Sequence, residues 1–194
     1  MSNVNYPDFS DVKGQSRLVK ACAVAAAGKH NLLIVGPPGS GKTMVARRLT
    51  GILPFTASQR KEAMDLYDQG GFDTSGKDFL VQAPFRAPHH TISLQGIIGQ
   101  RRSLKNYPGE AVLANKGLLF LDELAEFPRQ VLEGLRPVLG QKSVSLFGSY
   151  TAQESEKFDA NFILVGAMDE CSCGRWGTKD CSCSEDQRQR YFNR

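Results

Sequence analysis

The sequence lacks the features that mark membrane-spanning and secreted proteins. None of its apolar runs approaches the roughly 18 residues that a bilayer-spanning helix requires. Its first residues do not show the charged, apolar and small-residue segments of a secretory leader. We therefore expect a soluble, cytoplasmic protein with no membrane partner.

The sequence also lacks a strong excess of one charge. It has 24 Lys and Arg residues against 20 Asp and Glu residues, which gives a net charge of +4. A balance this small does not by itself indicate a nucleic-acid partner. No internal repeat or low-complexity segment is present, and 194 residues suffice for one globular domain that buries roughly 70% of its unfolded surface. One domain with insertions is the simplest interpretation.

Cysteine is scarce, but four of the five cysteines lie within residues 171–183. Four thiolates from two C-x-C pairs can surround a tetrahedral Zn²⁺, although C-x-C is tighter than the commoner C-x₂-C spacing. Four free thiols in a reducing cytoplasm are the alternative. The candidate zinc ligands are Cys171, Cys173, Cys181 and Cys183.

Three short apolar runs predict the strands of a parallel sheet. Leu32–Val35, Leu118–Leu121 and Phe162–Val165 are continuous and apolar, which is typical of parallel strands buried on both faces. Helical patterns lie between or beside them, so we predict an α/β fold with a parallel sheet flanked by helices. The predicted helices span Leu18–Ala27, Lys42–Leu49, Ser58–Asp68 and Arg129–Leu139.

Two segments interrupt this alternation of strands and helices. Gly70–Pro84 is rich in Gly, Asp and Lys, and we expect it to form a loop. Lys142–Phe158 alternates apolar and polar residues around Gly148 and Ser149. This alternation predicts a β-hairpin that projects from the sheet.

Residues 36–43 match the phosphate-loop pattern G-x-x-x-x-G-K-[ST] between a predicted strand and a predicted helix. The glycines allow backbone N–H groups to turn towards a phosphate, and the helix N-terminus adds positive potential. Lys42 would reach the β- and γ-phosphates, and Thr43 would ligate Mg²⁺. A chance glycine-rich turn is the alternative. The expected nucleotide-binding residues of this loop are Pro38, Gly39, Ser40, Gly41, Lys42 and Thr43.

A pair of carboxylates follows the second predicted strand. Asp122 and Glu123 come directly after Leu118–Leu121, and ligands of open α/β sheets bind at the carboxyl ends of the strands. We expect Asp122 to hold the Mg²⁺ shell and Glu123 to polarise the attacking water. A solvated acidic strand end is the alternative, and the phosphate loop argues against it.

The combination of GPPGSGKT with an apolar strand ending in Asp-Glu resembles the AAA+ ATPases, which are P-loop NTPases. Further stretches resemble the magnesium-chelatase-like group of that superfamily, the YifB/ComM family, over nearly the whole chain. These stretches are Phe9–Gln15, Ala25–Leu33, Pro84–Ser93 and Pro108–Glu110.

The resemblance implies a ring-forming MgATPase with a helix-2 insert within Leu80–Asn106 and a hairpin near Val144–Phe158 that faces the ring pore. It implies that Val12 and Gly14 lie near the adenine. Members of the ComM kind are thought to be DNA motors, whereas the related magnesium-chelatase subunit drives metal insertion into a porphyrin. DNA and a homo-oligomeric ring are therefore the partners that the resemblance implies.

Histidines and basic residues of the insert leave alternatives open. His89 and His90 could bind a metal, but neighbours in a strand point to opposite faces, so a structural or interface role is favoured. A basic group in this part of the chain could contact nucleic acid or another subunit, or could be an ordinary solvated face. This group consists of Arg86, Arg101, Arg102 and Lys105.

The chain departs from the family pattern at the end of its third predicted strand. The family has a sensor asparagine there that orients the lytic water, and this chain has Asp169. A carboxylate adds negative charge near the γ-phosphate but can still accept a hydrogen bond from water. The resemblance also implies that the arginine-finger helix, the last core strand and the helical lid follow the residues given, which leaves Leu32–Val35 at an exposed sheet edge.

These observations predict an AAA+ core that binds MgATP, with Glu123 as the catalytic carboxylate and a remodelling or DNA-motor role in the complete protein. A chelatase motor subunit and a nucleotide-binding module that does not hydrolyse ATP are the alternatives. Little ATP turnover is expected from these 194 residues alone, because an arginine finger supplies roughly 10³ to 10⁵ in rate in other phosphate-loop enzymes.

Overall fold

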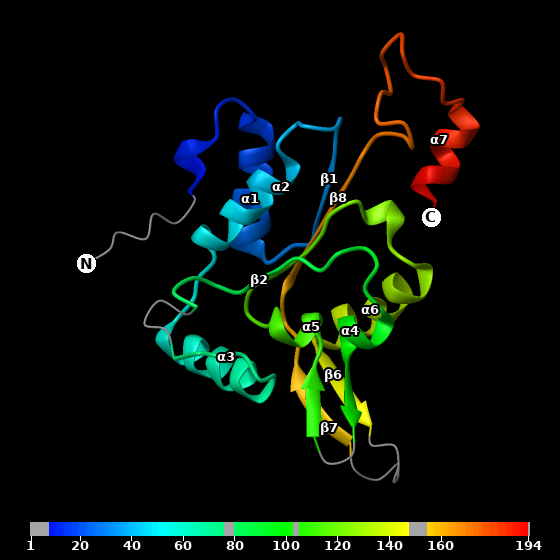
Figure 1. Ribbon diagram of the computed structural model, residues 1–194. Helices are drawn as coiled ribbons and strands as arrows, with labels where there is room; N and C mark the ends of the chain where they lie inside the picture. Colours follow the sequence, from blue (N-terminus) through cyan, green and yellow to red (C-terminus); the bar gives the residue numbers. More distant parts are fainter. Residues whose placement is uncertain (1–7, 76–79, 103–104, 148–154, 194) are drawn as a thin grey trace.

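The computed structural model describes residues 8–75, 80–102, 105–147 and 155–193, and it is built around a four-stranded sheet (Figure 1). The strand order is β1-β8-β5-β2, and all three strand pairs are parallel. The predicted α/β fold, a parallel sheet flanked by helices, is therefore confirmed. The strands are β1 (Leu32–Val35), β2 (Phe85–Arg86), β5 (Leu118–Leu121) and β8 (Ile163–Met168).

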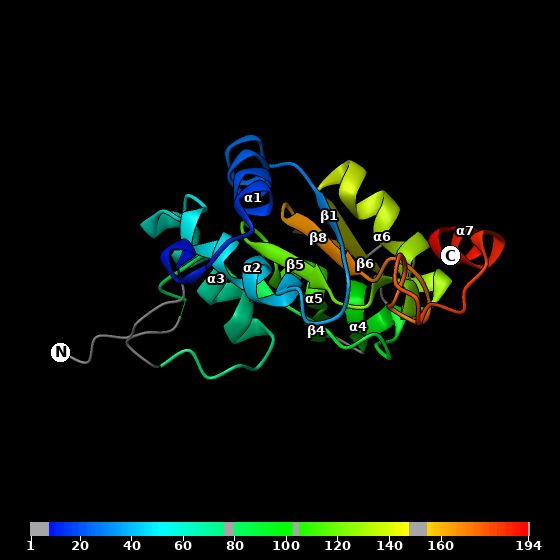
Figure 2. The same cartoon turned by 90° about the horizontal axis from the view of Figure 1, so that it is seen from above.

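Helices cover both faces of the sheet (Figure 2). The four predicted helices are present, and the structure extends three of them by one or two residues at one or both ends. The α-helices are α1 (Ser16–Gly28), α2 (Lys42–Leu49), α3 (Ala57–Gln69), α4 (Leu94–Ile98), α5 (Glu110–Leu113), α6 (Arg129–Gln141) and α7 (Glu185–Phe192). Short 3₁₀ helices are η1 (Phe9–Asp11), η2 (Thr50–Ile52) and η3 (Leu124–Glu126).

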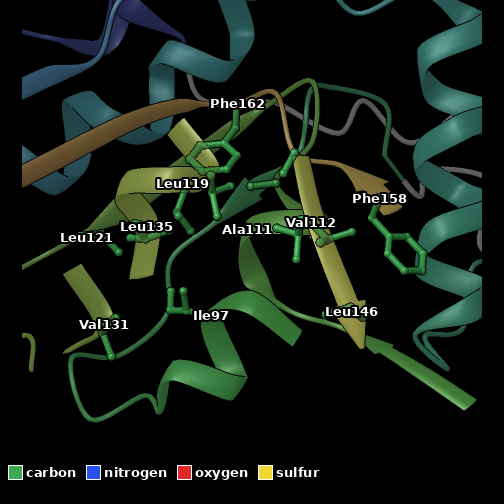
Figure 3. Close-up of a cluster of buried hydrophobic side chains, with 14 of the residues drawn as sticks. Ile97, Ala111, Val112, Leu119, Leu121, Val131, Leu135, Leu146, Phe158 and Phe162 are labelled. Carbon is green, nitrogen blue, oxygen red and sulfur yellow. The ribbon is translucent and has the colours of Figure 1, made fainter. Parts of the chain in front are cut away.

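Strand β5 separates two hydrophobic cores, because successive side chains of a strand point to opposite faces. Leu118 and Phe120 belong to a cluster with residues of α1 and α2. Leu119 and Leu121 belong to the other cluster, with residues of α4, α5 and α6 (Figure 3). All four side chains of β5 are buried. Packing on both faces of the sheet therefore holds in place the strand that leads to Asp122 and Glu123.

Strand β1 lies at one edge of the sheet. Within the described residues it pairs only with β8, from Leu32 opposite Val165 to Val35 opposite Met168. Leu33 and Val35 are 51% and 40% exposed. The expectation of burial on both faces is therefore wrong for this strand, and the edge position implied by the family resemblance is correct.

Two antiparallel hairpins project from one end of the sheet (Figure 1). Strand β3 (Gly99–Arg102) pairs with β4 (Lys105–Pro108), and β6 (Ser143–Phe147) pairs with β7 (Ser155–Asp159). The second pair confirms the hairpin predicted within Lys142–Phe158, and its expected turn at Gly148 and Ser149 lies outside the described residues.

The predicted boundaries of the insert need one correction. Strand β2 lies inside the expected range Leu80–Asn106, but it pairs with β5 and belongs to the central sheet. Its two residues are too few to show any periodic pattern in the sequence. The insertion that carries α4 and the β3-β4 hairpin therefore begins after Arg86 and continues to Pro108.

No helix in the described part of the chain combines the length and the apolar character needed to cross a bilayer.

Candidate functional site

The phosphate loop, residues 36–43, leads from β1 into α2. Its backbone is left-handed at Gly39 (φ +73°) and Gly41 (φ +86°), a conformation that favours glycine. A side chain at Gly39 would meet no atom within 4 Å, so the loop is open on that side. Gly41 caps the N-terminus of α2, where unpaired backbone N–H groups and the helix dipole favour an anion.

Lys42 spans this loop and reaches the neighbouring strand. Its Nζ atom donates to the carbonyl oxygens of Gly36 and Pro37, at 2.8 and 3.0 Å. It also forms an ion pair with Asp169 Oδ1 at 2.8 Å. The Lys42 side chain is 11% exposed. The structure thus places the phosphate-loop lysine and the sensor-position carboxylate in direct contact.

Thr43 and Asp122 meet across the carboxyl edge of the sheet. Thr43 Oγ1 donates a hydrogen bond to Asp122 Oδ2 at 2.7 Å, although the two residues are far apart in the sequence. The second carboxylate oxygen of Asp122 accepts from the backbone N–H of Glu123 at 3.1 Å. Hydroxyl and carboxylate oxygens are the ligands that Mg²⁺ takes in phosphate-loop enzymes, so this pair fits the metal that the sequence implies.

Glu123 lies at a bend in the backbone and its side chain is accessible. It has a left-handed conformation (φ +55°) at the start of η3, and its side chain is 66% exposed. His90 Nδ1 lies 3.2 Å from Glu123 Oε2. A water molecule can therefore reach this carboxylate.

His89 and His90 do not lie in a strand as the sequence suggests. They follow β2, and a turn begins at His90. Their rings do not point to opposite faces but lie beside each other, with centroids 4.0 Å apart. The structural or interface role of the pair stays a prediction, and His90 reaches the candidate catalytic carboxylate.

The phosphate loop, the two carboxylates after β5 and Asp169 surround one cavity of about 580 Å³. Tyr191 of α7 contributes to its wall and is almost fully buried. Burial raises the pKa of Tyr191, and the charge of Asp169 raises it further. No sequence pattern indicates this tyrosine, because it follows the cysteine cluster on a short polar helix. The other lining residues are Pro38, Gly39, Ser40, Gly41, Lys42, Thr43, Met44, Asp122, Glu123, Glu126, Met168, Asp169 and Ser172.

Val12 and Gly14 do not line this cavity in the described part of the structure. Val12 packs against the core cluster that α1 and α2 share, and Gly14 has a left-handed backbone (φ +71°). The next residue connects this segment to the phosphate loop, because Gln15 Nε2 donates to the carbonyl oxygen of Ser40 at 3.1 Å. The segment that contains Val12 and Gly14 is therefore attached to the phosphate loop, but these two residues lie outside the cavity.

The four clustered cysteines come together as the sequence predicts. Cys171 Sγ lies 3.4 Å from Cys173 Sγ and 3.9 Å from Cys181 Sγ, and the latter two sulfurs are 3.6 Å apart. All four sulfurs, including that of Cys183, lie within 4.8 Å of one another. Since Zn–S bonds are about 2.3 Å long, a tetrahedral site places its sulfurs about 3.8 Å apart, and the cluster fits that geometry.

The buried member of this cluster favours the thiolate form. Burial of Cys171 raises the pKa of its thiol, but the hydrogen bonds from Cys173 and from the backbone N–H of Arg175 outweigh it. The resulting pKa of the Cys171 thiol is about 6, well below the ordinary value of 9.0. A thiolate is the form that binds metal.

Arg86 does not belong to a solvent-facing basic group. Its Nε and one terminal nitrogen donate to the two carboxylate oxygens of Glu110, at 2.5 and 2.7 Å. The guanidinium carbon lies 5.6 Å from the ring centroid of Tyr67 and 5.5 Å from that of Phe72. The hydrogen bonds that Arg86 donates to Glu110 raise the pKa of Arg86 above its ordinary value. In this conformation two of the guanidinium nitrogens of Arg86 are engaged by Glu110, which favours a role of Arg86 within the fold.

For the other basic residues of the insert, a contact with nucleic acid or another subunit stays a prediction. The side chains of Arg102 and Lys105 lie outside the described part of the structure, and the role of Arg101 stays a prediction.

Comparison with known proteins gives consistent results. Residues 8–194 match the family model described as magnesium chelatase, subunit ChlI. The chain is 39% identical over 203 residues to competence protein ComM of Haemophilus influenzae, covering 100% of this chain and 37% of that protein. It is 38% identical over 188 residues to the uncharacterized protein YifB of Salmonella typhimurium, covering 96% of this chain and 36% of that protein. The chain thus spans little more than a third of the length of these relatives.

Solved structures share the fold at lower identity. A complex between subunits BchI and BchD of magnesium chelatase matches with a TM-score of 0.60 and 21% identity, covering 84% of this chain and 55% of that chain. NtrX from Brucella abortus in complex with ADP matches with a TM-score of 0.54 and 19% identity, covering 93% of this chain and 35% of that chain. The architecture is that of an AAA+ P-loop NTPase, and the chain belongs to the family of magnesium chelatase subunit ChlI.

Proposed function

We propose that residues 1–194 form the MgATP-binding AAA+ core of a motor ATPase. One observation carries the proposal: the 2.7 Å contact between Thr43 and Asp122 lies in the same cavity as Lys42 and Glu123. Four functional groups from two separate loops converge there. Each has the chemistry that the hydrolysis of a nucleoside triphosphate requires.

The phosphate loop and Lys42 bind the triphosphate. Backbone N–H groups at the start of α2 contact its oxygens, and Lys42 exchanges its partner Asp169 for the β- and γ-phosphates. Thr43 and Asp122 would hold Mg²⁺, whose charge neutralises the phosphate oxygens when it is bound. The contacts of Lys42 with Gly36 and Pro37 keep its ammonium group above the loop during this exchange.

Glu123 acts as the general base. It accepts a proton from a water molecule whose oxygen bonds to the γ-phosphorus, while the bond from that phosphorus to the β–γ bridging oxygen breaks. The products are ADP and inorganic phosphate. Asp169, next to the γ-phosphate position, accepts a hydrogen bond from the same water and orients it. Val12 and Gly14 would contact the adenine, and the Gln15–Ser40 hydrogen bond that ties their segment to the loop supports this assignment.

Lys42→Ala tests nucleotide binding. We expect MgATP affinity to fall by about 100-fold or more, because charge-assisted hydrogen bonds from a largely buried cation contribute about 3 kcal/mol. Titration calorimetry measures the change. Lys61→Ala, which removes an exposed lysine of α3, is the matched control and should bind like the wild type. Unchanged affinity in Lys42→Ala would overturn the assignment.

The wider function that we propose is a ring-forming motor that acts on DNA, supported by the 39% identity to competence protein ComM. The similarity to the complex of BchI and BchD favours a second candidate, a motor subunit of a chelatase. Stimulation of ATP hydrolysis by DNA would select the first, and its absence the second. Nucleotide binding without any turnover would instead indicate a binding module.

We also propose that the cysteine cluster binds one Zn²⁺ per chain. The support is the match between its sulfur separations and a tetrahedral thiolate site. A cytoplasmic location, where thiols stay reduced, fits this role. Elemental analysis of protein purified without chelator should find about one zinc per chain. Absence of zinc, with all four thiols reactive towards a thiol reagent, would contradict the proposal.

A further inference from the structure

The cysteine cluster and the nucleotide cavity share a wall. Strand β8 ends at Met168, Asp169 then contacts Lys42, and Cys171 follows two residues later. Ser172, which lies between two of the clustered cysteines, lines the nucleotide cavity. We call residues 169–184 the cysteine loop. Its described backbone contains turns but no helix or strand.

The cysteine loop also contacts the phosphate loop directly, at Gly174. This residue is buried and left-handed (φ +69°). A Cβ atom at Gly174 would lie 2.7 Å from Pro38 Cγ and 3.1 Å from Asp169 Oδ2. Pro38 belongs to the phosphate loop, so the two loops are packed together with no space for a methyl group between them.

Helix α7 follows the cysteine loop in the chain and packs back against its first half. Arg188 Nε donates to the carbonyl oxygen of Glu170 at 3.3 Å, and its guanidinium carbon lies 4.6 Å from the Trp176 ring centroid. The same helix places Tyr191 in a small core cluster with Met168 and Ala125. The cysteine loop therefore connects two parts of the cavity wall, Pro38 and Tyr191.

We propose that metal bound by the four cysteines and nucleotide bound in the cavity stabilise each other, with the Gly174–Pro38 contact as the connection between them. This inference rests on the proposed MgATP site and the proposed zinc site. A loop with no helix or strand holds one conformation only when other contacts fix it. Four metal–sulfur bonds would fix this loop, and hence the position of Gly174 against Pro38 and of α7 beside the cavity.

The coupling acts through preorganisation. In the metal-free protein the cysteine loop gains conformational freedom, and nucleotide binding must then order the cavity wall at a cost in entropy. In the metal-loaded protein the wall is already ordered. Thermodynamic linkage requires the reverse effect of equal size, so that nucleotide also tightens the binding of the metal.

The first experiment compares zinc-loaded protein with protein stripped by a chelator under reducing conditions, using a fluorescent ADP with Mg²⁺ as the probe. We expect the affinity for MgADP to fall by about tenfold on removal of zinc, within the ordinary range of allosteric coupling. Zinc added back should restore it. In the reciprocal measurement, saturating MgADP should raise the affinity for zinc, measured by competition with a chromophoric chelator, by the same factor.

The second experiment breaks the connection and keeps all four thiols. Gly174→Ala places a methyl group against Pro38, and Gly177→Ala is its matched control. Gly177 lies in the same loop with a similar left-handed backbone (φ +78°), but a Cβ atom there meets nothing within 4 Å. Both variants carry the backbone strain of alanine at positive φ. We expect both to bind one zinc, and only Gly174→Ala to lose about tenfold in MgADP affinity.

The outcomes separate this inference from the proposals beneath it. Zinc-loaded wild type that binds no MgADP would overturn the proposed function, and protein that binds no zinc would overturn the metal site. Equal MgADP affinity of the loaded and stripped proteins, or of the two glycine variants, would overturn the coupling alone. Circular dichroism of the stripped protein checks that it is folded. Because Pro38 itself lines the cavity, the coupling also requires that removal of zinc weaken MgADP binding less in Gly174→Ala than in Gly177→Ala.

Discussion

Two ion pairs in this molecule join similar groups in different surroundings. Lys42 and Asp169 form a single contact of 2.8 Å at the carboxyl edge of the sheet, with side chains that are 11% and 33% exposed. Arg86 and Glu110 form a bidentate contact between β2 and α5, with side chains that are 22% and 20% exposed. Both pairs connect residues that are distant in the sequence.

The two ion pairs are suited to different roles, one to binding a ligand and the other to stabilising the fold. The lysine ammonium is a compact charge on a flexible stem that can exchange one anion for another. The arginine is held by two parallel hydrogen bonds and lies over two aromatic rings, a geometry that fixes its orientation towards Glu110. We therefore expect substitutions at the carboxyl edge to change nucleotide chemistry with little effect on stability, and substitutions around Arg86 to do the reverse.

The largest expected effect is on catalysis at the carboxyl edge. Glu123→Gln keeps the shape of the side chain and removes the group that takes a proton from water. ATP hydrolysis should fall by about 10² to 10⁴, and the free energy of unfolding should hardly change, because the side chain is 66% exposed. Phosphate release measures the rate, under conditions in which the wild-type protein hydrolyses ATP.

Glu126→Gln is the control for this prediction. Glu126 lines the same cavity, but it lies in η3 and not in the Asp-Glu pair that follows β5. The variant should retain most of the wild-type rate. Wild-type turnover by Glu123→Gln, or an equal loss in both variants, would show that Glu123 is not the general base.

The next effect tests the other ion pair. Arg86→Ala leaves Glu110 without its bidentate partner and removes packing against Tyr67 and Phe72. Breaking a fully buried pair costs about 3–5 kcal/mol, and the partial exposure of this pair reduces our expectation to about 2–3 kcal/mol. Urea denaturation measures the change, and the affinity for MgADP should remain that of the wild type.

The matched control is Arg129→Ala, which removes the i,i+4 ion pair with Glu133. That pair is highly exposed, at 84% and 52%, so its loss should change stability by less than about 0.5 kcal/mol. If Arg86→Ala weakened nucleotide binding and left stability intact, the division between the two regions would be wrong.

The sequence predicted most of the sheet and the phosphate site because the signals there are local. Three strands and four helices show apolar patterns of sufficient length, and the structure places Leu118–Leu121 and Lys42–Leu49 at the predicted bounds. Adjacent residues of the phosphate loop suffice to indicate its chemistry. Strand β2 was missed because two residues carry no periodicity.

The long-range contacts could not be predicted in the same way. Nothing in the residues around Arg86 indicates that it pairs with Glu110, and the turn that directs His90 towards Glu123 resembles a strand in the sequence. The cysteine spacing predicted the cluster, but not that Gly174 packs against Pro38. Such contacts depend on how the strands are ordered in the sheet, which local patterns do not specify.

The smallest expected effect concerns the carboxylate that now holds Lys42. Asp169→Asn removes one negative charge from beside the lysine and from beside the γ-phosphate position. MgATP should therefore bind about fivefold more tightly, since a partly exposed ion pair contributes about 1 kcal/mol. The gain should be smaller for MgADP, which lacks the γ-phosphate. Lys42 keeps its hydrogen bonds to Gly36 and Pro37, so stability should fall by less than about 1 kcal/mol.

Titration calorimetry with both nucleotides measures this difference, and Glu126→Gln again serves as the control. It removes one negative charge from the same cavity and leaves the ion pair between Lys42 and Asp169 in place, so any general effect of charge appears in both variants. A selective gain for MgATP in Asp169→Asn would show that the ion pair competes with the γ-phosphate for the lysine. Weaker MgATP binding by Asp169→Asn would instead show that the carboxylate supports the bound nucleotide, and that the two ion pairs differ less than their surroundings suggest.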